Sequence, residues 1–304
     1  MTATPMPHPE ARAELRTVRD LLRYAVTRFG AAGLAFGHGS ATAYDEAAYL
    51  ILHTLHLPID TLDPFLDARL LPDEVGTVLD VIHRRADQRV PAAYLTGEAW
   101  LGEFRFLVDE RVIVPRSFIA EWLRDGFTPW IDEPGSVHRV LDLCTGSGCL
   151  AIVAAHLFPN ATIDAVDLSP AALEVARANV ALYNLQDRVQ VVESDLFKAL
   201  HGERYDVILT NPPYVPTASM ATLPAEYRHE PVTALAAGDD GLDIVRRIMA
   251  DAACYLSPRG IMVVEVGHER DAVETAWPRM PMTWLSTSAG DDMVYLVDRD
   301  ALVS

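Results

Sequence analysis

Short apolar segments alternate regularly with helical segments from Val137 to the end of the chain, and this alternation constrains the fold more than any other feature. The apolar segments have the length of strands, and the segments between them have the length and starting residues of helices. The predicted strands are Arg139–Leu143, Ala161–Val166, Val189–Val192, Tyr205–Leu209, Ile261–Val266, Met282–Leu285 and Met293–Val297, and the predicted helices are Cys149–Leu157, Pro170–Leu182, Leu242–Tyr255 and Ala272–Trp277. Such alternation produces a mostly parallel sheet that is covered by helices on both faces. We therefore predict an α/β fold with a Rossmann-like, seven-stranded sheet whose last two strands, joined by Gly290-Asp291-Asp292, are antiparallel.

The region before this sheet has helical periodicity. Apolar residues recur at steps of three and four between Leu15 and Arg89, and Pro58, Pro64 and Pro72 interrupt the pattern. We predict a small helical domain over residues 1–93, in which residues 1–10 form a disordered tail. Residues 94–136 are predicted to be a linker that contains a hairpin of two strands joined near Asp109-Glu110, and residues 137–304 form the second domain.

A glycine-rich turn follows the first strand of the sheet and opens a helix. Glycines let a ligand approach the backbone, and a helix N-terminus favours acceptor or anionic groups. Asp167 ends the next strand, 19 residues after Gly148, where a carboxylate can hold both hydroxyls of a ribose. Asp195 follows the third strand, where it can accept a hydrogen bond from an adenine amino group, with Leu196 or Phe197 flanking the ring. Asp142 either contacts the amine of a ligand or caps the turn. The candidate cofactor-binding residues are Asp142, Thr145, Gly146, Gly148, Asp167, Asp195 and Asn211.

The sequence Asn211-Pro212-Pro213-Tyr214 comes after the apolar run Tyr205–Leu209. Two prolines fix their φ angles and have no N–H, so this turn is rigid. It presents the side-chain oxygen of Asn211 and the carbonyl of Pro212 as two fixed acceptors, beside the flat face of Tyr214. That arrangement suits a planar NH₂ group whose nitrogen lone pair points out of plane at an electrophile. We therefore predict methyl transfer to an amide or aromatic amine, with S-adenosylmethionine as the cofactor. Asn211, Pro212 and Tyr214 are the candidate catalytic residues, and Pro213 joins them in binding the substrate.

The composition and net charge of the chain limit the classes of molecule that it is expected to bind. The formal net charge is −18, which disfavours binding to a phosphate backbone and fits a basic protein as the partner. Cys144, Cys149 and Cys254 show no metal-ligand spacing, so we expect neither a metal site nor a disulfide framework. The first 14 residues do not resemble a signal peptide, and no stretch approaches 18 apolar residues, so we expect a cytoplasmic protein without a membrane span.

Taken together, these residues resemble the class I methyltransferases that modify the side-chain amide of protein glutamine. The resemblance covers nearly the whole chain, and the branch most similar to it modifies large-subunit ribosomal protein three. Besides the two turns, the resemblance rests on Leu21–Val26, Phe36–Gly39, Ala93–Thr96, Val108–Val112, Pro115–Ser117 and Glu226–Pro231. Phe118 departs from the pattern, since a proline is expected there. The resemblance implies that residues 1–93 recognise the substrate. It also implies that Arg116 and Glu121 lie at the rim of the site near the domain junction, where Arg116 either binds the substrate or forms an ion pair.

Three other functions compete with this interpretation. Enzymes of a sister branch methylate glutamine in peptide-chain release factors, and they carry Pro-Arg-Pro-Glu-Thr-Glu where this chain has Pro115–Glu121. Enzymes that methylate the exocyclic amine of adenine in nucleic acids share the Asn-Pro-Pro-Tyr turn, but the charge of −18 and the lack of a basic, aromatic-rich groove oppose that function. A non-catalytic ribosome-assembly factor has no need of an intact cofactor turn.

Overall fold

The computed structural model describes residues 14–37 and 39–303, and the chain divides into two compact units. One unit comprises residues up to Glu98 together with the segment Pro224–His229, and we call it the helical unit. The other comprises Ala99–Leu223 and the residues from Glu230 onward, and we call it the sheet unit. The tail predicted over residues 1–10 lies outside the described residues. Within the described ranges, no helix is long and apolar enough to cross a membrane.

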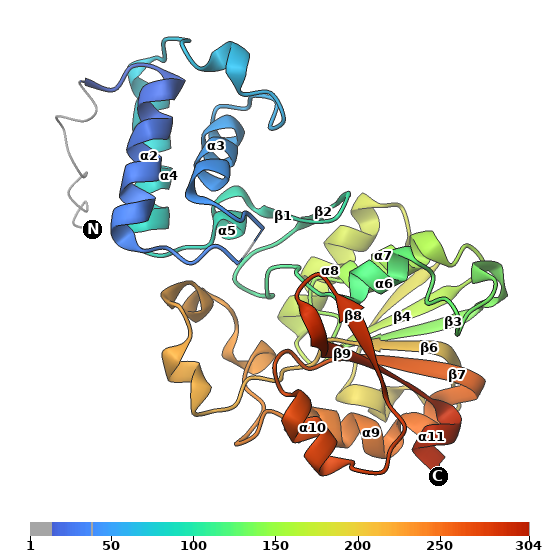
Figure 1. The fold of residues 1–304 in the computed structure, drawn as a ribbon. Helices are drawn as coiled ribbons and strands as arrows, with labels where there is room; N and C mark the ends of the chain where they lie inside the picture. Colours follow the sequence, from blue (N-terminus) through green and yellow to red (C-terminus); the bar gives the residue numbers. More distant parts are fainter. Residues whose placement is uncertain (1–13, 38, 304) are drawn as a thin grey trace. The chain divides into compact units, whose positions relative to one another are not determined.

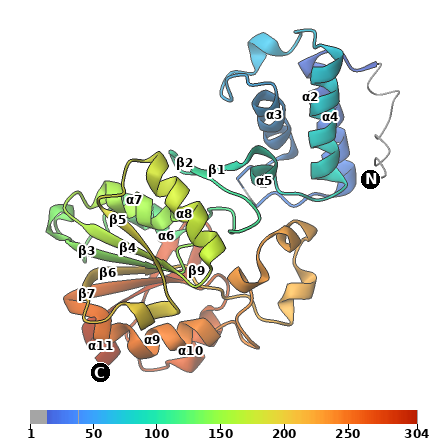
Figure 2. The ribbon, with the colours of Figure 1, turned by 180° about the vertical axis from the view of Figure 1, so that it is seen from behind.

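The sheet unit contains the predicted seven-stranded, mostly parallel sheet, in the order β5-β4-β3-β6-β7-β9-β8. Strands β5, β4, β3, β6 and β7 are parallel, and β9 runs antiparallel to both β7 and β8. The strands are β3 (Arg139–Leu143), β4 (Thr162–Asp167), β5 (Val189–Glu193), β6 (Tyr205–Thr210), β7 (Leu256–Glu265), β8 (Thr283–Thr287) and β9 (Gly290–Asp298). Figures 1 and 2 show one face of the sheet covered by α6, α7 and α8, and the other by α9, α10 and α11. These helices are α6 (Ile119–Arg124), α7 (Cys149–Leu157), α8 (Pro170–Leu182), α9 (Asp243–Tyr255), α10 (Arg270–Ala276) and α11 (Arg299–Val303).

The local sequence explains how this sheet brings its strand ends together. The side chain of Ser169 accepts a hydrogen bond from Ala172 N at the start of α8, and Pro170 occupies the first turn. Helix α7 is apolar and almost wholly buried, so it packs directly on the sheet. Leu143 pairs with Val166 on β4 and with Thr210 on β6, so the carboxyl ends of these three strands meet at one edge. In such a sheet, ligands bind at this edge, where the strand order reverses.

Three helices form the core of the helical unit: α2 (Val18–Ala32), α3 (Ala43–Thr54) and α4 (Pro72–Ala86). Thr17 and Asp20 form a capping box at the start of α2, and Thr42 caps α3. A short 3₁₀ helix, η1 (Asp63–Phe65), and a five-residue helix, α5 (Ala92–Thr96), complete this part of the chain. The remaining 3₁₀ helices are η2 (Pro134–Ser136), η3 (Leu196–Ala199), η4 (Ser219–Thr222), η5 (Ala225–His229) and η6 (Val232–Ala234).

Some predicted boundaries were wrong. The hairpin of β1 (Glu98–Leu101) and β2 (Phe104–Leu107) turns at Gly102, whose φ of 64° suits glycine, and not near Asp109-Glu110. The side chain of Asp109 instead accepts a hydrogen bond from Arg111 N after the hairpin. Strand β7 begins at Leu256, before the predicted Ile261, because Leu256 already pairs with Tyr205 of β6; a register shift between Tyr205 and Val207 accommodates the residues between Leu256 and Ile261. Helices α6 and α11 were not predicted.

Candidate functional site

A cavity of about 350 Å³ lies at the carboxyl ends of the parallel strands. Its walls come from residues at or just after the ends of β3, β4, β5 and β6, together with residues 111–113 and residues of α8, η6 and α9. They include Cys144, Gly146, Asp167, Leu168, Ser194, Asp195, Leu196, Asn211, Pro213, Thr233, Ile244 and Arg247. The structure thus brings four of the predicted cofactor-binding residues into one cavity, namely Gly146, Asp167, Asp195 and Asn211.

Asp167 is held firmly at the end of β4. One carboxylate oxygen accepts a hydrogen bond from Gly146 N at 2.9 Å, and the other accepts one from Ser169 N at 2.9 Å. Burial raises the pKa of Asp167, while these backbone N–H groups oppose the rise. Because each carboxylate oxygen has a second lone pair, Asp167 can still accept hydrogen bonds from the hydroxyls of a ligand.

Asp195 has cationic partners that the sequence analysis did not predict. Arg247 Nη2 and Lys198 Nζ each donate to its carboxylate at 2.6 Å, and these bonds hold the pKa of Asp195 below its usual range. Arg247 belongs to α9 and lines the cavity itself. Of the two predicted flanking residues, Leu196 lines the cavity, whereas Phe197 is buried and stacks on Tyr255 with ring centroids 4.5 Å apart. Of these two residues, only Leu196 therefore contributes to the apolar wall of the cavity.

A second, much smaller cavity of about 30 Å³ shares Ile113, Cys144, Gly146 and Asn211 with the first. Its lining also includes Pro115, Arg116, Ser117, Asp142, Thr145 and Ser147. Two further predicted cofactor-binding residues, Asp142 and Thr145, and the predicted substrate-binding residue Arg116 therefore lie at this cavity.

Asp142 is buried in β3, and only one of its two carboxylate oxygens accepts hydrogen bonds from the described residues. Its Oδ2 accepts hydrogen bonds from Thr145 Oγ1 at 2.5 Å and from Ala151 N at 3.0 Å. Its Oδ1 is buried and has no hydrogen-bond partner among the described residues. Burial raises the pKa of Asp142 from 3.8 to about 7. An unpaired buried carboxylate oxygen beside a cavity is chemically suited to an ammonium group.

The two glycines of the turn have different surroundings. Gly146, with φ of 54°, lines both cavities. Gly148 lines neither: a Cβ atom there would lie 3.3 Å from Cβ of Ala176, so this glycine allows α7 and α8 to approach closely. Cys144, named in the sequence only as one of three cysteines without metal-ligand or disulfide spacing, adopts a left-handed φ of 59° and lines both cavities. The sequence feature that could have identified Cys144 as a site residue is its position between the strand and the first glycine of the turn.

The Asn211–Tyr214 turn lies where β6 ends. Asn211 lines both cavities, Pro213 lines the larger one, and Pro212 is buried. Tyr214 lines neither cavity; its ring packs so closely on Gly267 that a Cβ atom there would lie 2.6 Å from Tyr214 Cε2. Among the four residues of the turn, Asn211 is thus the one placed to contact ligands in both cavities.

The segment after Ile113 is fixed by buried carboxylates. Arg116 forms a two-pronged ion pair with Glu230, whose side chain is fully buried. Glu265 accepts hydrogen bonds from Ser117 Oγ at 2.5 Å and from Phe118 N at 3.0 Å. A proline has no N–H to donate, so the bond from position 118 to Glu265 forms only because this chain has Phe118 where the family pattern has a proline. Glu121 bonds to Ser288 N at 2.9 Å and lines neither cavity.

Glu265 was not among the predicted site residues. It follows Val264, which pairs with Thr210, just as Asn211 follows Thr210, so Glu265 and Asn211 continue neighbouring strands. Burial raises the pKa of Glu265 to about 7, and the hydrogen bonds from Ser117 and Phe118 oppose the rise. The sequence feature that could have identified Glu265 as a site residue is its position as a carboxylate near the end of the apolar run Ile261–Val266. Within residues 14–37 and 39–303, no group of three His, Cys, Asp or Glu side chains is arranged to hold a metal ion.

Comparison with known proteins shows which protein family the chain resembles. The model of the methyltransferase small domain matches residues 129–225. The ribosomal protein uL3 glutamine methyltransferase of Bordetella pertussis is 60% identical over 291 residues, which cover 96% of this chain and 98% of that protein. The protein of the same name from Burkholderia pseudomallei is 58% identical over 99% of this chain and 98% of its own length. Among solved structures, the hMettl16 catalytic domain in complex with MAT2A 3'UTR hairpin 1 has a TM-score of 0.50 at 21% identity. The match covers 84% of this chain and 88% of that chain, and it supports the class I methyltransferase fold.

Proposed function

The chain belongs to the family of ribosomal protein uL3 glutamine methyltransferases, and on this premise we propose that it methylates the side-chain amide nitrogen of a glutamine in uL3 with S-adenosylmethionine as the donor. The observation that carries the proposal is the position of Asn211, which directly follows the last residue of β6 and lines both cavities. A side-chain amide oxygen there can hold an NH₂ group against a ligand in the larger cavity. We place the reaction in the cytoplasm, with a basic protein as the substrate.

The residues of the two cavities fit S-adenosylmethionine. Asp167 would hold the ribose hydroxyls, and Leu196 would pack on the adenine ring near Asp195. The unpaired Oδ1 of Asp142 would accept a hydrogen bond from the ammonium group of the methionine portion. When bound, the cofactor supplies an electrophilic methyl group on a sulfonium sulfur.

The protein's own residues would activate a poor nucleophile. A carboxamide nitrogen has its lone pair delocalised into the carbonyl. Hydrogen bonds from its two N–H groups to the Asn211 side-chain oxygen and the Pro212 carbonyl localise that lone pair and stabilise the positive charge that develops on nitrogen. The rigid turn also fixes the direction of approach, which lowers the entropic part of the barrier. The product then releases a proton to solvent, so this mechanism requires no dedicated base.

The direct test is methyl transfer from labelled S-adenosylmethionine to purified uL3, with mass spectrometry of the modified residue. We expect label on a glutamine of uL3, and Asn211→Ala should lower turnover by about 10²–10³ while leaving cofactor affinity nearly unchanged. Asn160→Ala is the matched control, because Asn160 is an exposed asparagine that lines neither cavity. Loss of turnover and cofactor affinity together in Asn211→Ala would contradict its assigned role.

Two further substrates in the same assay separate the competing functions. Label on a release factor but not on uL3 would keep the chemistry and move the chain to the sister branch. Label on adenine in RNA or DNA would show that the turn serves a nucleic-acid amine, and no label with a normal cofactor titration would favour a binding protein.

A further inference from the structure

The helical unit includes a segment from a distant part of the chain. The chain leaves the sheet unit after Leu223, contributes Pro224–His229 to the helical unit, and re-enters the sheet unit at Glu230. This segment is the tip of the loop that begins at the Asn211–Tyr214 turn. The base of the loop is closed by hydrogen bonds from Val215 N to Leu235 O at 2.8 Å and from Ala237 N to Val215 O at 3.0 Å.

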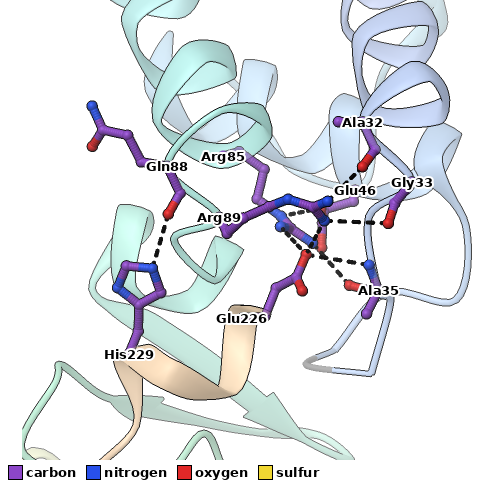
Figure 3. Close-up of polar contacts among 9 residues, drawn as sticks. All are labelled: Ala32, Gly33, Ala35, Glu46, Arg85, Gln88, Arg89, Glu226 and His229. Atoms are coloured by element: carbon purple, nitrogen blue, oxygen red, sulfur yellow. Dashed lines mark hydrogen bonds and ion pairs between the residues drawn. The ribbon is translucent and has the colours of Figure 1, made fainter. Parts of the chain in front are cut away.

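A buried arginine of α4 binds this tip. Arg85 is 1% exposed, and its Nε donates to Glu46 Oε1 of α3 at 2.6 Å. Its Nη1 donates to Glu226 Oε1 of the tip at 3.1 Å, and its Nη2 donates to the carbonyl of Ala35 at 2.9 Å. Glu46 and Glu226 are each 1% exposed as well, and Figure 3 shows the three side chains converging.

Two more donors complete the binding of Glu226. Arg89 Nη1 donates to the same Oε1 at 3.1 Å, and Ala35 N donates to it at 3.2 Å. Glu226 Oε2 is buried and has no hydrogen-bond partner in the described part of the chain. At the end of the tip, His229 Nε2 lies 2.9 Å from the carbonyl of Gln88 (Figure 3). The cluster therefore balances two guanidinium groups against two carboxylates, and one of those carboxylates belongs to the loop.

Such an arrangement holds the loop strongly. Removing one partner of a buried ion pair leaves an uncompensated buried charge, which costs far more than breaking a pair at the surface. Burial opposes ionisation of Glu226, but hydrogen bonds from its own backbone, Arg85 and Ala35 lower its pKa. The carboxylate is therefore charged at neutral pH. Releasing the tip would leave Arg85 paired with Glu46, and it would leave the charge of Arg89 facing the carbonyls of Ala32 and Gly33.

The return of the loop to the cavity is fixed separately. Glu230 accepts hydrogen bonds from Arg116 and, at 3.1 Å, from Val114 N. The residues that follow it, Pro231, Thr233 and Ala234, line the larger cavity. Glu226 and Glu230 thus anchor different parts of the same loop, and we expect the residues at the cavity to stay in place when Glu226 is replaced.

We propose that Glu226 is a positioning residue for the protein substrate: its ion pairs with Arg85 and Arg89 hold the loop after the Asn211–Tyr214 turn in the conformation that accepts uL3. This inference rests on the proposed function. It assigns different roles to the two carboxylates of the Glu226–Pro231 sequence. Glu226 orders the loop for the protein substrate, and Glu230 orders it at the cofactor cavity.

The test compares Glu226→Gln with Glu46→Gln in the full-length enzyme. Both variants remove one carboxylate from Arg85 at equal burial, but Glu46 lies in α3 and its removal leaves the tip bound. In Glu226→Gln we expect the KM for uL3 to rise at least about tenfold, because the apparent affinity falls with the fraction of enzyme in the competent state. The kcat and the cofactor Kd should stay near their wild-type values. Hydrogen exchange followed by mass spectrometry should show faster exchange over residues 216–229 in this variant.

In Glu46→Gln we expect loss of stability in the helical unit without the change in KM or the faster exchange in the loop. Equal KM and equal loop exchange in the two variants would overturn the inference and leave Glu226 with a purely structural role. Wild-type enzyme assayed beside them keeps the two proposals apart, because absence of label on uL3 in the wild type refutes the proposed function alone. In that case the comparison of loop exchange decides whether Glu226 orders the loop.

Discussion

Replacing Asp142 with asparagine should make the cofactor-free protein more stable at neutral and alkaline pH, although it places a buried N–H donor where the protein offers no acceptor among the described residues. The reason is the environment of Asp142, where burial raises the pKa from 3.8 to about 7. A raised pKa means that the folded state binds the proton more tightly than the unfolded state. The contribution of Asp142 to stability is therefore fully present below about pH 4 and is lost as the pH rises to about 7.

The size of this loss follows from the pKa. At 1.36 kcal/mol for each tenfold change in proton affinity, the rise from 3.8 to about 7 corresponds to about 4 kcal/mol. Asparagine avoids this cost. Its oxygen can replace Oδ2 as the acceptor for Thr145 and Ala151, but its NH₂ group then occupies the place of Oδ1, which has no partner among the described residues. A buried donor without a partner costs about 1–3 kcal/mol. We therefore expect Asp142→Asn to be more stable than wild type by about 1–3 kcal/mol near pH 8 and less stable by a similar amount near pH 4.

Urea unfolding followed by tryptophan fluorescence measures this difference cleanly, because all five tryptophans of the chain belong to the sheet unit. With saturating S-adenosylmethionine near pH 8, the wild type should instead be more stable than Asp142→Asn. A ligand ammonium beside the Asp142 carboxylate compensates its charge, and asparagine offers no such partner. A wild-type-minus-variant difference that does not change with pH would refute the assigned ionisation of Asp142. A cofactor affinity unchanged by the substitution would refute its assigned contact with the ammonium group.

Two other substitutions test the supports of the site. Asn179→Ala should destabilise the sheet unit by about 3 kcal/mol, because the buried Asn179 side chain makes three hydrogen bonds, with Leu107 N, Leu107 O and Ser147 O, at about 1 kcal/mol each; an unchanged urea midpoint would contradict this. Phe118→Pro suits the φ of −71° but removes the N–H that donates to Glu265, so the pKa of Glu265 should rise further. The resulting loss of stability, about 1–3 kcal/mol, should be larger at alkaline pH, where the lost bond is one to a carboxylate; equal losses near pH 5 and near pH 9 would contradict this reasoning.

The sheet and part of the site could be predicted because they depend on short-range patterns and one topological rule. Apolar segments of strand length fix the strands, and the carboxyl ends of parallel strands meet at one edge. For this reason Gly146, Asp167, Asp195 and Asn211 lie around one cavity although they are widely spaced in the sequence. The hairpin turn was mispredicted because polar residues at 109–110 and a glycine at 102 are equally good turn signals in the sequence alone.

Other parts of the site depend on pairings that the sequence does not reveal. Arg247 meets Asp195 only because α9 packs beside η3, the short helix that follows Asp195, and Glu265 is next to Asn211 only because β7 is the neighbour of β6. The ion pair between Arg85 and Glu226 joins residues 141 positions apart. Charged residues are usually exposed, so their sequence positions give no indication that they are buried together.

The charges of the site favour a cationic ligand over a neutral one. Burial raises the pKa of Asp142, Asp167 and Glu265, whereas the pKa of Asp195, which pairs with Lys198 and Arg247, is lowered. Three carboxyl groups near the strand ends are thus insufficiently compensated by the protein's own cations, and a bound cation would lower their pKa values and gain the corresponding interaction energy. The proposed donor carries a sulfonium charge that disappears when the methyl group is transferred. The carboxylates that attract the donor should therefore hold the demethylated product less tightly, so the same charge distribution favours both donor binding and product release.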